Sequence, residues 1–409
     1  MSYYQNLREH LKALEDNGKL RKVTRVINKD TQLVPLARLQ YRGLPQEQRT
    51  AFLFENVTDS LGRKYDTPVL LGALAGSRDI FALGMQCQAE EIMYRLAEAE
   101  RNPIAPVEIS SAPVQEEIYI GDDLEKIGGL GRFPIPIFTP GFDPAPYITA
   151  PYWVTKDPDS GIHNIGMYRA MLKAPLRTGI NFAHARRGGA IHLQKYRKRG
   201  KPMPAILVIG GPPNLGYAAV SQLPTDVDEF GVAGGIAGTS LETVRGKTVD
   251  LPVPAHAEIV FEGEVTTDEL EPEAPFGEAY GFVGLRDMNP FFTVKCITCR
   301  RNPIWLATIS QYPPTESSII RHYANSGTLY KHLYHSLGFT EVLGVSYVEE
   351  VGSRPIAVIQ IGEVTHSTSW DILEEAAKRM PTTKLFIGVN KDVNHHDIDS
   401  VMLAIMMRS

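Results

Sequence analysis

The chain has 409 residues, which corresponds to two or three domains of ordinary size. Hydrophobic residues make up 43% and charged residues 22%, as in a typical soluble globular protein, and the net charge of −5 argues against a nucleic-acid partner. We find no secretory signal and no apolar run long enough to span a bilayer, so a cytoplasmic protein without a membrane partner is expected. The three cysteines are too few for a disulfide framework, which fits a reducing compartment.

The first hundred residues alternate between helical and extended patterns. A helix is predicted where apolar residues recur at helical spacing, at Tyr4, Leu7, Leu11 and Leu14. Strands are predicted at residues 20–26, 51–57 and 68–74. Further helices are predicted from about residue 30 and over residues 88–101, the latter ending before Asn102-Pro103. Residues 1–105 are therefore predicted to form an N-terminal α/β domain.

The pattern then changes to many short apolar runs separated by Pro, Gly and Asp, which predicts a β-sandwich or barrel. Examples of these runs are residues 147–154, 205–209, 257–261 and 291–297, and two helices are predicted at 189–199 and 225–237. From residue 316 a long helical pattern follows, with a break expected at Gly327. Strands at 342–348, 356–361 and 385–389 and a helix opened by Ser369 then predict a second α/β domain.

Cys296 and Cys299 form a C-x-x-C pair, which raises the possibility of a redox or zinc site. No second pair exists, and the surrounding segment is predicted to be a strand, on which residues three apart point to opposite faces. We therefore interpret both as ordinary strand cysteines.

Residues 271–281 (E-P-E-A-P-F-G-E-A-Y-G) combine three glutamates with two prolines, which exclude a helix and predict a stiff turn. Such a turn can hold two carboxylates in fixed positions, as acid–base chemistry requires. The alternative is a solvated acidic loop. The interleaved aromatic residues Phe276, Tyr280 and Phe282 favour a partly buried carboxylate pair.

A second group of polar residues lies in the barrel-like region, where Asn164 to Arg169 is followed by His184 and by Arg187-Gly188-Gly189 at a predicted helix start. Arginines beside glycines at a helix N-terminus favour an anion such as phosphate, although a basic surface turn has the same composition. Asn164 and Glu242 offer hard oxygen ligands for a divalent metal ion. The usual nucleotide-binding motifs are absent.

Four motifs resemble a known family: N-x-G-x-Y-R at residues 164–169, R-G-G at 187–189, L-E-x-V at 241–244 and E-x-P-F-G-E at 273–278. Three further segments match in the same order: K-D-P-D-S-G at 156–161, L-P-V-P-A-H-A-E-I-V-F-E-G at 251–263 and I-T-C-R-R-N-P-I at 297–304. The resemblance covers nearly the whole chain, which is identified as a member of the UbiD family of decarboxylases that depend on prenylated FMN.

The resemblance implies a mixed α/β fold with three parts. These are an N-terminal α/β domain (residues 1–105), a central split β-barrel of the flavin-reductase type that binds prenylated FMN (106–310), and a long helix joined to a C-terminal α/β domain (311–409). A homodimer or a higher homo-oligomer is expected, with a flavin prenyltransferase as the supplier of the cofactor.

The resemblance also implies roles for individual residues. Arg169, Glu273 and Glu278 would be catalytic. Asn164 and Glu242 would hold a divalent metal, Mn²⁺ by preference, on the flavin phosphate, with K⁺ as a further candidate ion. Cofactor contacts are implied for Asn164, Met167, Tyr168, Arg169, Phe182, His184, Arg187, Gly188 and Glu242.

The sequence departs from the family pattern near its end. The usual D-x-x-x-W-A-x-x-T-R appears at residues 399–408 without its Trp and its Thr. Relatives usually continue with a segment that covers the site or joins subunits, so a short or a shortened member is expected. These departures concern subunit contacts and closure of the pocket rather than the chemistry.

The expected reaction is reversible, non-oxidative decarboxylation of an aromatic, heteroaromatic or α,β-unsaturated acid. Loss of CO2 from an sp² carbon leaves a carbanion that no side chain can stabilise, so a cofactor must accept the electrons. By resemblance, Glu278 would protonate that carbon, and this predicts an apolar wall around Glu278. The Arg169–Glu273 pair would orient Glu278 and support maturation of the cofactor.

Two alternatives remain open. One is a plain FMN-binding redox protein on the same barrel, in which Glu273 and Glu278 would have no task. The other is a scaffold subunit of a multi-subunit aryl carboxylase, against which the complete Arg–Glu–Glu set argues. By resemblance, residues 311–318 line the substrate side, with Arg321 and His322 behind them. Their polarity predicts an acid that carries a further polar group.

Overall fold

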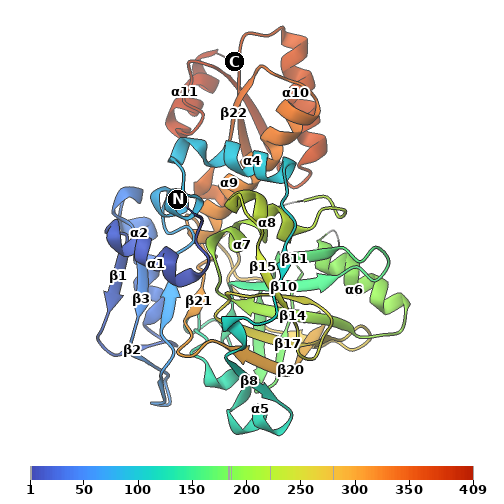
Figure 1. The fold of residues 1–409 in the computed structure, drawn as a ribbon. Helices are drawn as coiled ribbons and strands as arrows, with labels where there is room; N and C mark the ends of the chain where they lie inside the picture. Colours follow the sequence, from blue (N-terminus) through green and yellow to red (C-terminus); the bar gives the residue numbers. More distant parts are fainter. Residues whose placement is uncertain (1, 183–184, 186, 222, 280, 409) are drawn as a thin grey trace.

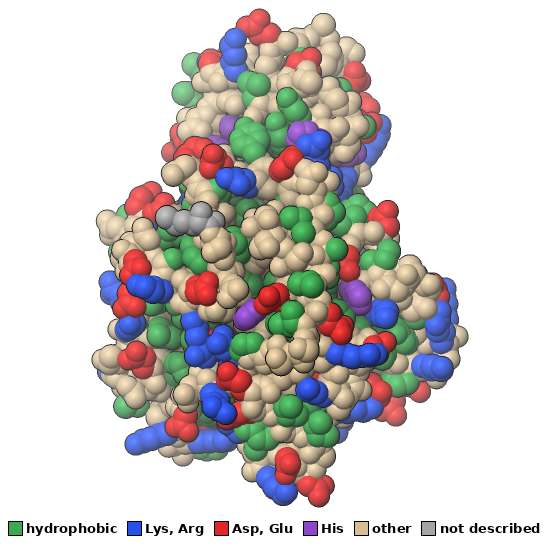
Figure 2. Space-filling model, viewed as in Figure 1, with side chains coloured by type: hydrophobic (Ala, Val, Ile, Leu, Met, Phe, Trp, Pro, Cys, Tyr) green, Lys and Arg blue, Asp and Glu red, His purple; other side chains and the backbone are tan. Residues whose placement is uncertain are grey.

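The computed structural model describes residues 2–182, 185, 187–221, 223–279 and 281–408. Figure 1 shows the N-terminal segment (blue) beside a large curved sheet (green to yellow), with the C-terminal elements (orange to red) at the far end of the molecule. Figure 2 shows acidic and basic side chains interspersed on the face in view. In the described ranges, no helix has both the length and the apolar character that a membrane crossing demands.

The N-terminal segment confirms the predicted alternation of helices and strands. Asn6 caps the first helix by accepting hydrogen bonds from the backbone N–H groups of Arg8 and Glu9, and the buried leucines of that helix face the core. Its elements are α1 (Leu7–Asp16), β1 (Leu20–Val23), β2 (Ile27–Asn28), α2 (Leu33–Gly43), β3 (Ala51–Phe54), β4 (Val57–Thr58), β5 (Lys64–Tyr65), β6 (Val69–Leu71), α3 (Arg78–Met85) and α4 (Ile92–Arg101).

The central segment forms a curled, antiparallel half-barrel in the strand order β11-β10-β14-β17-β20-β13-β12-β9, with β8 paired to β20. Cys296 and Cys299 are buried in β20 as free cysteines, which confirms them as strand residues. The strands are β8 (Glu117–Ile120), β9 (Tyr147–Ile148), β10 (Pro151–Lys156), β11 (His163–Met167), β12 (Ala170–Ala174), β13 (Arg177–Gly179), β14 (Met203–Ile209), β17 (Ile259–Val265) and β20 (Phe291–Cys299).

Smaller elements cover this sheet and extend it. The helices are α5 (Asp122–Lys126), α6 (Gly188–Lys198), α7 (Pro213–Ala218) and α8 (Glu229–Ala237). Two small sheets stand apart from the half-barrel: β7 (Val107–Glu108) with β15 (Glu242–Arg245) and β16 (Pro252–Pro254), and β18 (Glu271–Glu273) with β19 (Asp287–Asn289). The predicted stiff turn therefore begins as a short strand and becomes a loop only after Glu273.

The C-terminal segment is a three-stranded sheet in the order β22-β23-β24 with helices around it. Its elements are α9 (Glu316–Tyr330), which continues as a π-helical turn (Lys331–Ser336), β22 (Val342–Tyr347), β23 (Ile356–Ile361), α10 (His366–Arg379), β24 (Leu385–Asn390) and α11 (Ile398–Arg408). The expected start at Ser369 is wrong, because Thr365 caps α10 by accepting from the N–H of Thr368.

The expected break at Gly327 is also wrong. Gly327 lies inside α9, where a methyl group at its Cα would come within 2.9 Å of Leu96 Cβ and 3.2 Å of the Met93 carbonyl oxygen. The absence of a side chain at Gly327 therefore allows α9 to pack closely against α4. The two helices lie together beneath the C-terminal sheet (Figure 1).

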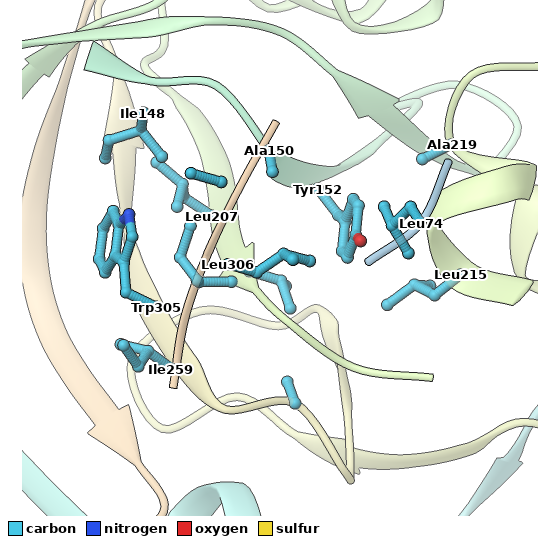
Figure 3. Close-up of a cluster of buried hydrophobic side chains, with 14 of the residues drawn as sticks. Leu74, Ile148, Ala150, Tyr152, Leu207, Leu215, Ala219, Ile259, Trp305 and Leu306 are labelled. Atoms are coloured by element: carbon cyan, nitrogen blue, oxygen red, sulfur yellow. The ribbon is translucent and has the colours of Figure 1, made fainter. Parts of the chain in front are cut away.

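The buried core is continuous between the N-terminal segment and the half-barrel. β21 (Trp305–Ala307) pairs with β6 in the N-terminal sheet, in the order β1-β3-β6-β21. Figure 3 shows Trp305 near Ile148, Leu207 and Ile259 of the half-barrel. The domain boundaries at residues 105 and 310 stay predictions. The β6–β21 pairing and the α4–α9 contact both link segments that lie on opposite sides of a predicted boundary.

We expect Gly327→Ala to lower the melting temperature. The new methyl group would force α4 and α9 apart, and such overpacking typically costs about 1–3 kcal/mol, more than the gain in helix propensity of about 1 kcal/mol. Gly43→Ala is the matched control, because that helical glycine has no neighbouring atom within 4 Å of an added Cβ. Equal melting temperatures for the two variants in thermal unfolding would contradict this account of the α4–α9 contact.

Candidate active site

Arg169 joins two carboxylates from a distant part of the chain. Its Nε donates to Glu273 Oε1 at 2.9 Å, and its Nη1 donates to Glu278 Oε1 at 2.6 Å. The structure thus brings together the three residues that the sequence singled out as a catalytic set, although they lie about a hundred positions apart.

Local structure explains why the three meet. Arg169 sits in the turn between β11 and β12, and Glu273 ends β18. Gly179 makes room for Glu273, since a Cβ there would lie 2.8 Å from Glu273 Oε2. Glu278 lies in the loop between β18 and β19, where its N–H donates to the Phe282 carbonyl at 2.7 Å.

An aromatic wall supports the loop from behind. The Phe276 ring is buried and packs against Tyr147 in a tilted arrangement, with ring centroids 4.1 Å apart. Its centroid lies 5.3 Å from the Arg169 guanidinium carbon. The Tyr147 hydroxyl donates to the Ala274 carbonyl at 2.9 Å. Phe276 therefore supports this part of the loop, as the sequence suggested, whereas Phe282 is exposed and Tyr280 lies outside the described residues.

The two glutamates differ in their surroundings. The Glu273 side chain is 1% exposed, whereas that of Glu278 is 33% exposed. Burial raises the pKa of Glu273, and the nearby Arg169 opposes that rise. Burial disfavours the charge on Arg169, but Glu273 and Glu278 outweigh it, so the pKa of Arg169 is raised. The burial that was predicted for the Glu278 side chain is thus found at the Glu273 side chain instead.

Two cavities meet at this site. The catalytic cavity, of about 200 Å³, is bordered by Arg169, Glu278 and Phe276. The anion cavity, of about 560 Å³, contains Asn164, Gly188 and Glu229 in its wall. Both cavities are lined by Tyr168, Arg187 and Arg354. Because they share these residues, one elongated ligand could occupy both.

The wall of the anion cavity is built at the N-terminus of α6. Arg187 occupies the capping position, and its guanidinium carbon lies 5.5 Å from the Tyr168 ring centroid. An added Cβ on Gly188 would meet the Asn164 side chain at 2.6 Å, and one on Gly189 would meet Phe182 at 2.7 Å. A guanidinium and a helix N-terminus side by side form a favourable site for an anion such as phosphate.

Asn164 is paired with Glu229, a residue that the sequence analysis passed over. The Asn164 amide donates to Glu229 Oε1 at 2.7 Å, and the Ile165 N–H donates to Oε2 at 2.9 Å. The Tyr168 hydroxyl donates to Asn164 Oδ1 at 2.9 Å. Burial raises the pKa of Glu229 to about 8.

These oxygens fit a divalent cation, since amide and carboxylate groups are hard ligands and a cation would offset the burial of Glu229. Among the described residues, no cluster of three His, Cys, Asp or Glu side chains suits a metal ion. A site here would therefore also use Asn164 and oxygens of the bound ligand.

The proposed metal ligand Glu242 is placed elsewhere. It opens β15, where its Oε2 lies 2.7 Å from His256 Nε2, and it is not among the residues that line the anion cavity. The carboxylate that lies beside Asn164 in the structure is therefore that of Glu229, and the assignment of Glu242 as a metal ligand stays a prediction. The sequence does contain a pattern that indicates Glu229. It is the first residue of an otherwise apolar helix (E-F-G-V-A-G-G-I-A), and a helix that is apolar on all sides is expected to be buried together with its carboxylate.

The remaining predicted contacts divide into three groups. Met167 lines the catalytic cavity and Gly188 the anion cavity. Phe182 is buried and packs edge-on against Tyr168, with ring centroids 5.0 Å apart. His184 lies outside the described residues.

Two family models match the sequence. The 3-octaprenyl-4-hydroxybenzoate carboxy-lyase Rift-related domain of the UbiD family matches residues 106–313, about half of the chain. The corresponding N-terminal domain matches residues 11–100. The chain belongs to the UbiD family. It is accordingly a UbiD-type carboxy-lyase of the class that uses prenylated FMN.

Known relatives resemble this UbiD protein along nearly its full length. An evolved dimeric form of the UbiD-class enzyme HmfF from Pelotomaculum thermopropionicum, in complex with prenylated FMN, is 29% identical with a TM-score of 0.90, covering 99% of this chain and 90% of that one. The vanillic acid decarboxylase of Sedimentibacter hydroxybenzoicus in closed form is 25% identical with a TM-score of 0.89, covering 100% and 85%. An uncharacterized protein of Synechocystis sp. is 29% identical, covering 98% and 82%.

We expect Arg169→Ala to destabilise this UbiD protein, and to do so more at pH 8 than at pH 5. Removing one partner of a buried ion pair typically costs about 3–5 kcal/mol. Without Arg169 the pKa of Glu273 in the folded protein would rise further. At pH 8 the folded protein would then still bind a proton at Glu273 that the unfolded chain has released, so the free energy of unfolding would fall as the pH rises.

Thermal unfolding at both pH values tests this expectation. The double variant Arg169→Ala/Glu273→Gln is the control, because it removes the buried carboxylate and should recover most of the loss at pH 8. A loss that does not depend on pH, or that the double variant does not reduce, would contradict the role given to the Arg169–Glu273 pair.

Proposed function

We propose that this enzyme catalyses the reversible, non-oxidative decarboxylation of an aromatic, heteroaromatic or α,β-unsaturated carboxylic acid with prenylated FMN, and that Glu278 is the proton donor. The observation that carries this proposal is the bridge from Arg169 to both Glu273 and Glu278 at the edge of a cavity that shares wall residues with the anion cavity. A positioned carboxylic acid beside a buried ion pair is suited to proton transfer.

The two cavities, which share wall residues, support a flavin mononucleotide as the ligand, because one has an anion site and the other has the acid–base group at its edge. The phosphate would lie at the N-terminus of α6 with Arg187 and Gly188, and the ring system would reach Met167, Tyr168 and Arg169. HmfF, which resembles this chain, has been solved with prenylated FMN and with FMN. A flavin prenyltransferase is the proposed supplier of the cofactor.

Each catalytic side chain has a separate task. Prenylated FMN, when bound, supplies an electrophilic carbon that accepts the electrons released with CO2. Glu278 gives its proton to the substrate carbon that has lost CO2. Arg169 fixes the direction of the Glu278 carboxyl group through its Nη1, and its Nε pairs with the buried Glu273. Phe276 excludes water from the back of this group.

Asn164 and Glu229 are the proposed protein ligands of a divalent metal ion, Mn²⁺ by preference, which would neutralise the flavin phosphate. Their oxygens belong to the class that hard cations prefer, and both line the anion cavity. In this proposal Glu229 replaces Glu242 as the metal carboxylate.

A homodimer or a higher homo-oligomer is the proposed assembly, in line with the dimeric form described for HmfF. The absorption spectrum of protein produced together with a flavin prenyltransferase would distinguish the alternatives. Modified flavin supports the decarboxylase, ordinary FMN supports the redox protein, and no flavin supports the scaffold subunit.

We expect Glu278→Gln to retain modified flavin and to lose about 10²–10⁴-fold in turnover, the usual contribution of a general acid. The amide can still accept the hydrogen bond from Arg169, so the binding geometry should survive. Glu271→Gln is the control, because Glu271 pairs with Lys173 and Arg177 in the same loop region without lining the catalytic cavity. Full turnover by Glu278→Gln would exclude Glu278 as the proton donor.

The metal assignment is tested by comparing Glu229→Ala with Glu242→Ala. We expect the first variant to lose bound Mn²⁺ and much of its flavin, because it removes the carboxylate beside Asn164. The second should keep both, because the Glu242 carboxylate contacts His256 outside the cavity. Metal analysis and the flavin-to-protein absorbance ratio provide the measurement, and the opposite pattern would restore Glu242 as the ligand.

A further inference from the structure

Glu278 lies between two glycines that pack against consecutive residues of the segment before α9. An added Cβ on Gly277 would lie 2.5 Å from Gln311 Cγ. One on Gly281 would lie 2.8 Å from Tyr312 Cδ2. The Tyr312 N–H also donates to the Glu278 carbonyl at 3.4 Å. The loop that carries the proposed proton donor therefore rests on Gln311 and Tyr312, one on each side of Glu278.

Both supporting residues are held by arginines of α2 that lie one helical turn apart. The Nη2 group of Arg38 donates to Gln311 Oε1 at 3.3 Å. The Arg42 guanidinium carbon lies 3.9 Å from the Tyr312 ring centroid, which makes a cation–π contact. The Nη2 group of Arg42 also donates to the Pro313 carbonyl. Residues four apart share one face of a helix, so α2 presents both guanidinium groups to this segment.

The backbone of Tyr312 indicates that these contacts impose a defined conformation. Its φ is +60°, in the left-handed region. For a residue with a bulky side chain this typically costs about 1–3 kcal/mol, and it persists only where the surrounding structure imposes it. The Tyr312 residue is 52% exposed, so burial of the ring does not account for that cost. The contacts with Arg42 and Gly281 are therefore the ones that we consider to hold it.

The loop of Glu278 depends on support from this side because it is exposed beyond the glutamate. Phe282 and Leu285 are both exposed, and the Glu278 side chain is 33% exposed. A general acid must lie within hydrogen-bond distance of the atom that it protonates. A displacement of about 1 Å can lower a rate about 100-fold. The contacts with α2 therefore bear on the proton transfer as well as on the fold.

We propose that Arg38 and Arg42 are positioning residues for the proton donor, and that they fix the loop of Glu278 through Gln311 and Tyr312. These four supporting residues are not among the described residues that line the catalytic cavity, so their effect passes through Glu278. The inference rests on the decarboxylase function proposed above and adds the N-terminal segment to its proton-transfer step.

The first test measures turnover of the flavin-loaded enzyme. It uses whichever of 4-hydroxybenzoate, 2-furoate and cinnamate reacts fastest, since these represent the three proposed substrate classes. Arg42→Met and Tyr312→Gly remove exposed side chains and should leave the protein folded. We expect each to lower kcat roughly ten- to 100-fold, with KM changed less than about twofold. The ratio of kcat in H2O to kcat in D2O should rise, because the slowed step is a proton transfer.

Conservative variants assign the effect to the contacts described above. Tyr312→Phe should keep most of kcat, because it retains the ring that contacts Arg42 and Gly281. Arg38→Met should lower kcat in the same way as Arg42→Met. If loss of the half-buried Arg38 prevents folding, the Arg42 and Tyr312 variants still decide the outcome.

Hydrogen exchange of the full chain, with and without flavin, gives a readout that does not depend on turnover. The N–H groups of Glu278 and Gly284 donate within the loop, to Phe282 and Phe276. We expect Arg42→Met and Tyr312→Gly to speed exchange of a peptide that spans residues 276–284 about tenfold or more. Exchange in the strands of the half-barrel should change little, because local opening leaves the rest of the fold intact.

Melting temperature separates positioning from stability. Glycine adopts the backbone conformation of Tyr312 without strain, so Tyr312→Gly should unfold at nearly the same temperature as the wild type although it loses kcat. Arg63→Met is the matched control. The Arg63 guanidinium carbon lies 5.0 Å from the Tyr65 ring centroid in another part of the N-terminal segment, and its loss should change neither kcat nor exchange of the loop peptide.

Three results would overturn the inference. These are an unchanged kcat in Arg42→Met and Tyr312→Gly, an unchanged exchange of the loop peptide in both, or an equal loss of kcat in Tyr312→Phe and Tyr312→Gly. Failure of the proposed function is a different result. In that case the loaded wild-type enzyme would release CO2 from none of the acids, whereas exchange of the loop peptide would still depend on Arg42 and Tyr312.

Discussion

The site depends on one guanidinium group that holds two carboxylates. Two glutamates this close together would repel each other, and the buried one would bind a proton, unless a cation lay between them. Arg169 supplies that cation and joins the turn after β11 to the loop after β18. The arrangement also explains the unequal burial of Glu273 and Glu278. The enclosed glutamate balances the charge of Arg169, and the more accessible one can exchange protons with a ligand.

Tyr168 connects this group to the anion site. It is the neighbour of Arg169 in the chain, and it lines both cavities. Its hydroxyl accepts from the Gly189 N–H at the start of α6 and donates to Asn164, which in turn pairs with Glu229. The consecutive residues Tyr168 and Arg169 therefore contact the two ends of the proposed cofactor site. A displacement of the Tyr168 side chain at the anion end would move the backbone next to Arg169 and its two glutamates.

The sequence predicted the parts of the site that depend on short-range patterns. The prolines and aromatic residues of residues 271–281 indicated a fixed carboxylate pair, and the resemblance of the E-x-P-F-G-E and N-x-G-x-Y-R motifs to the family implied the set Arg169, Glu273 and Glu278 before any contact was known. The sequence could not show whether Glu229 or Glu242 lies beside Asn164 as the candidate metal carboxylate. That depends on how α8 and β15 are placed against β11 in space. Gly327 shows the same limit. A glycine within a helical pattern predicts a break, and only the nearby α4 reveals that it serves close packing.

The pairing of β21 with β6 has a consequence for synthesis of the chain. The edge of β6 is completed by residues 305–307, which leave the ribosome more than two hundred residues after β6 itself. At about 5–20 residues per second, this interval lasts roughly ten to fifty seconds. Throughout it, a buried, apolar strand (Val-Leu-Leu) has an open edge that another chain could occupy. The nascent N-terminal segment is therefore a natural client for a chaperone during translation, and an isolated fragment that ends before residue 305 would keep that edge exposed.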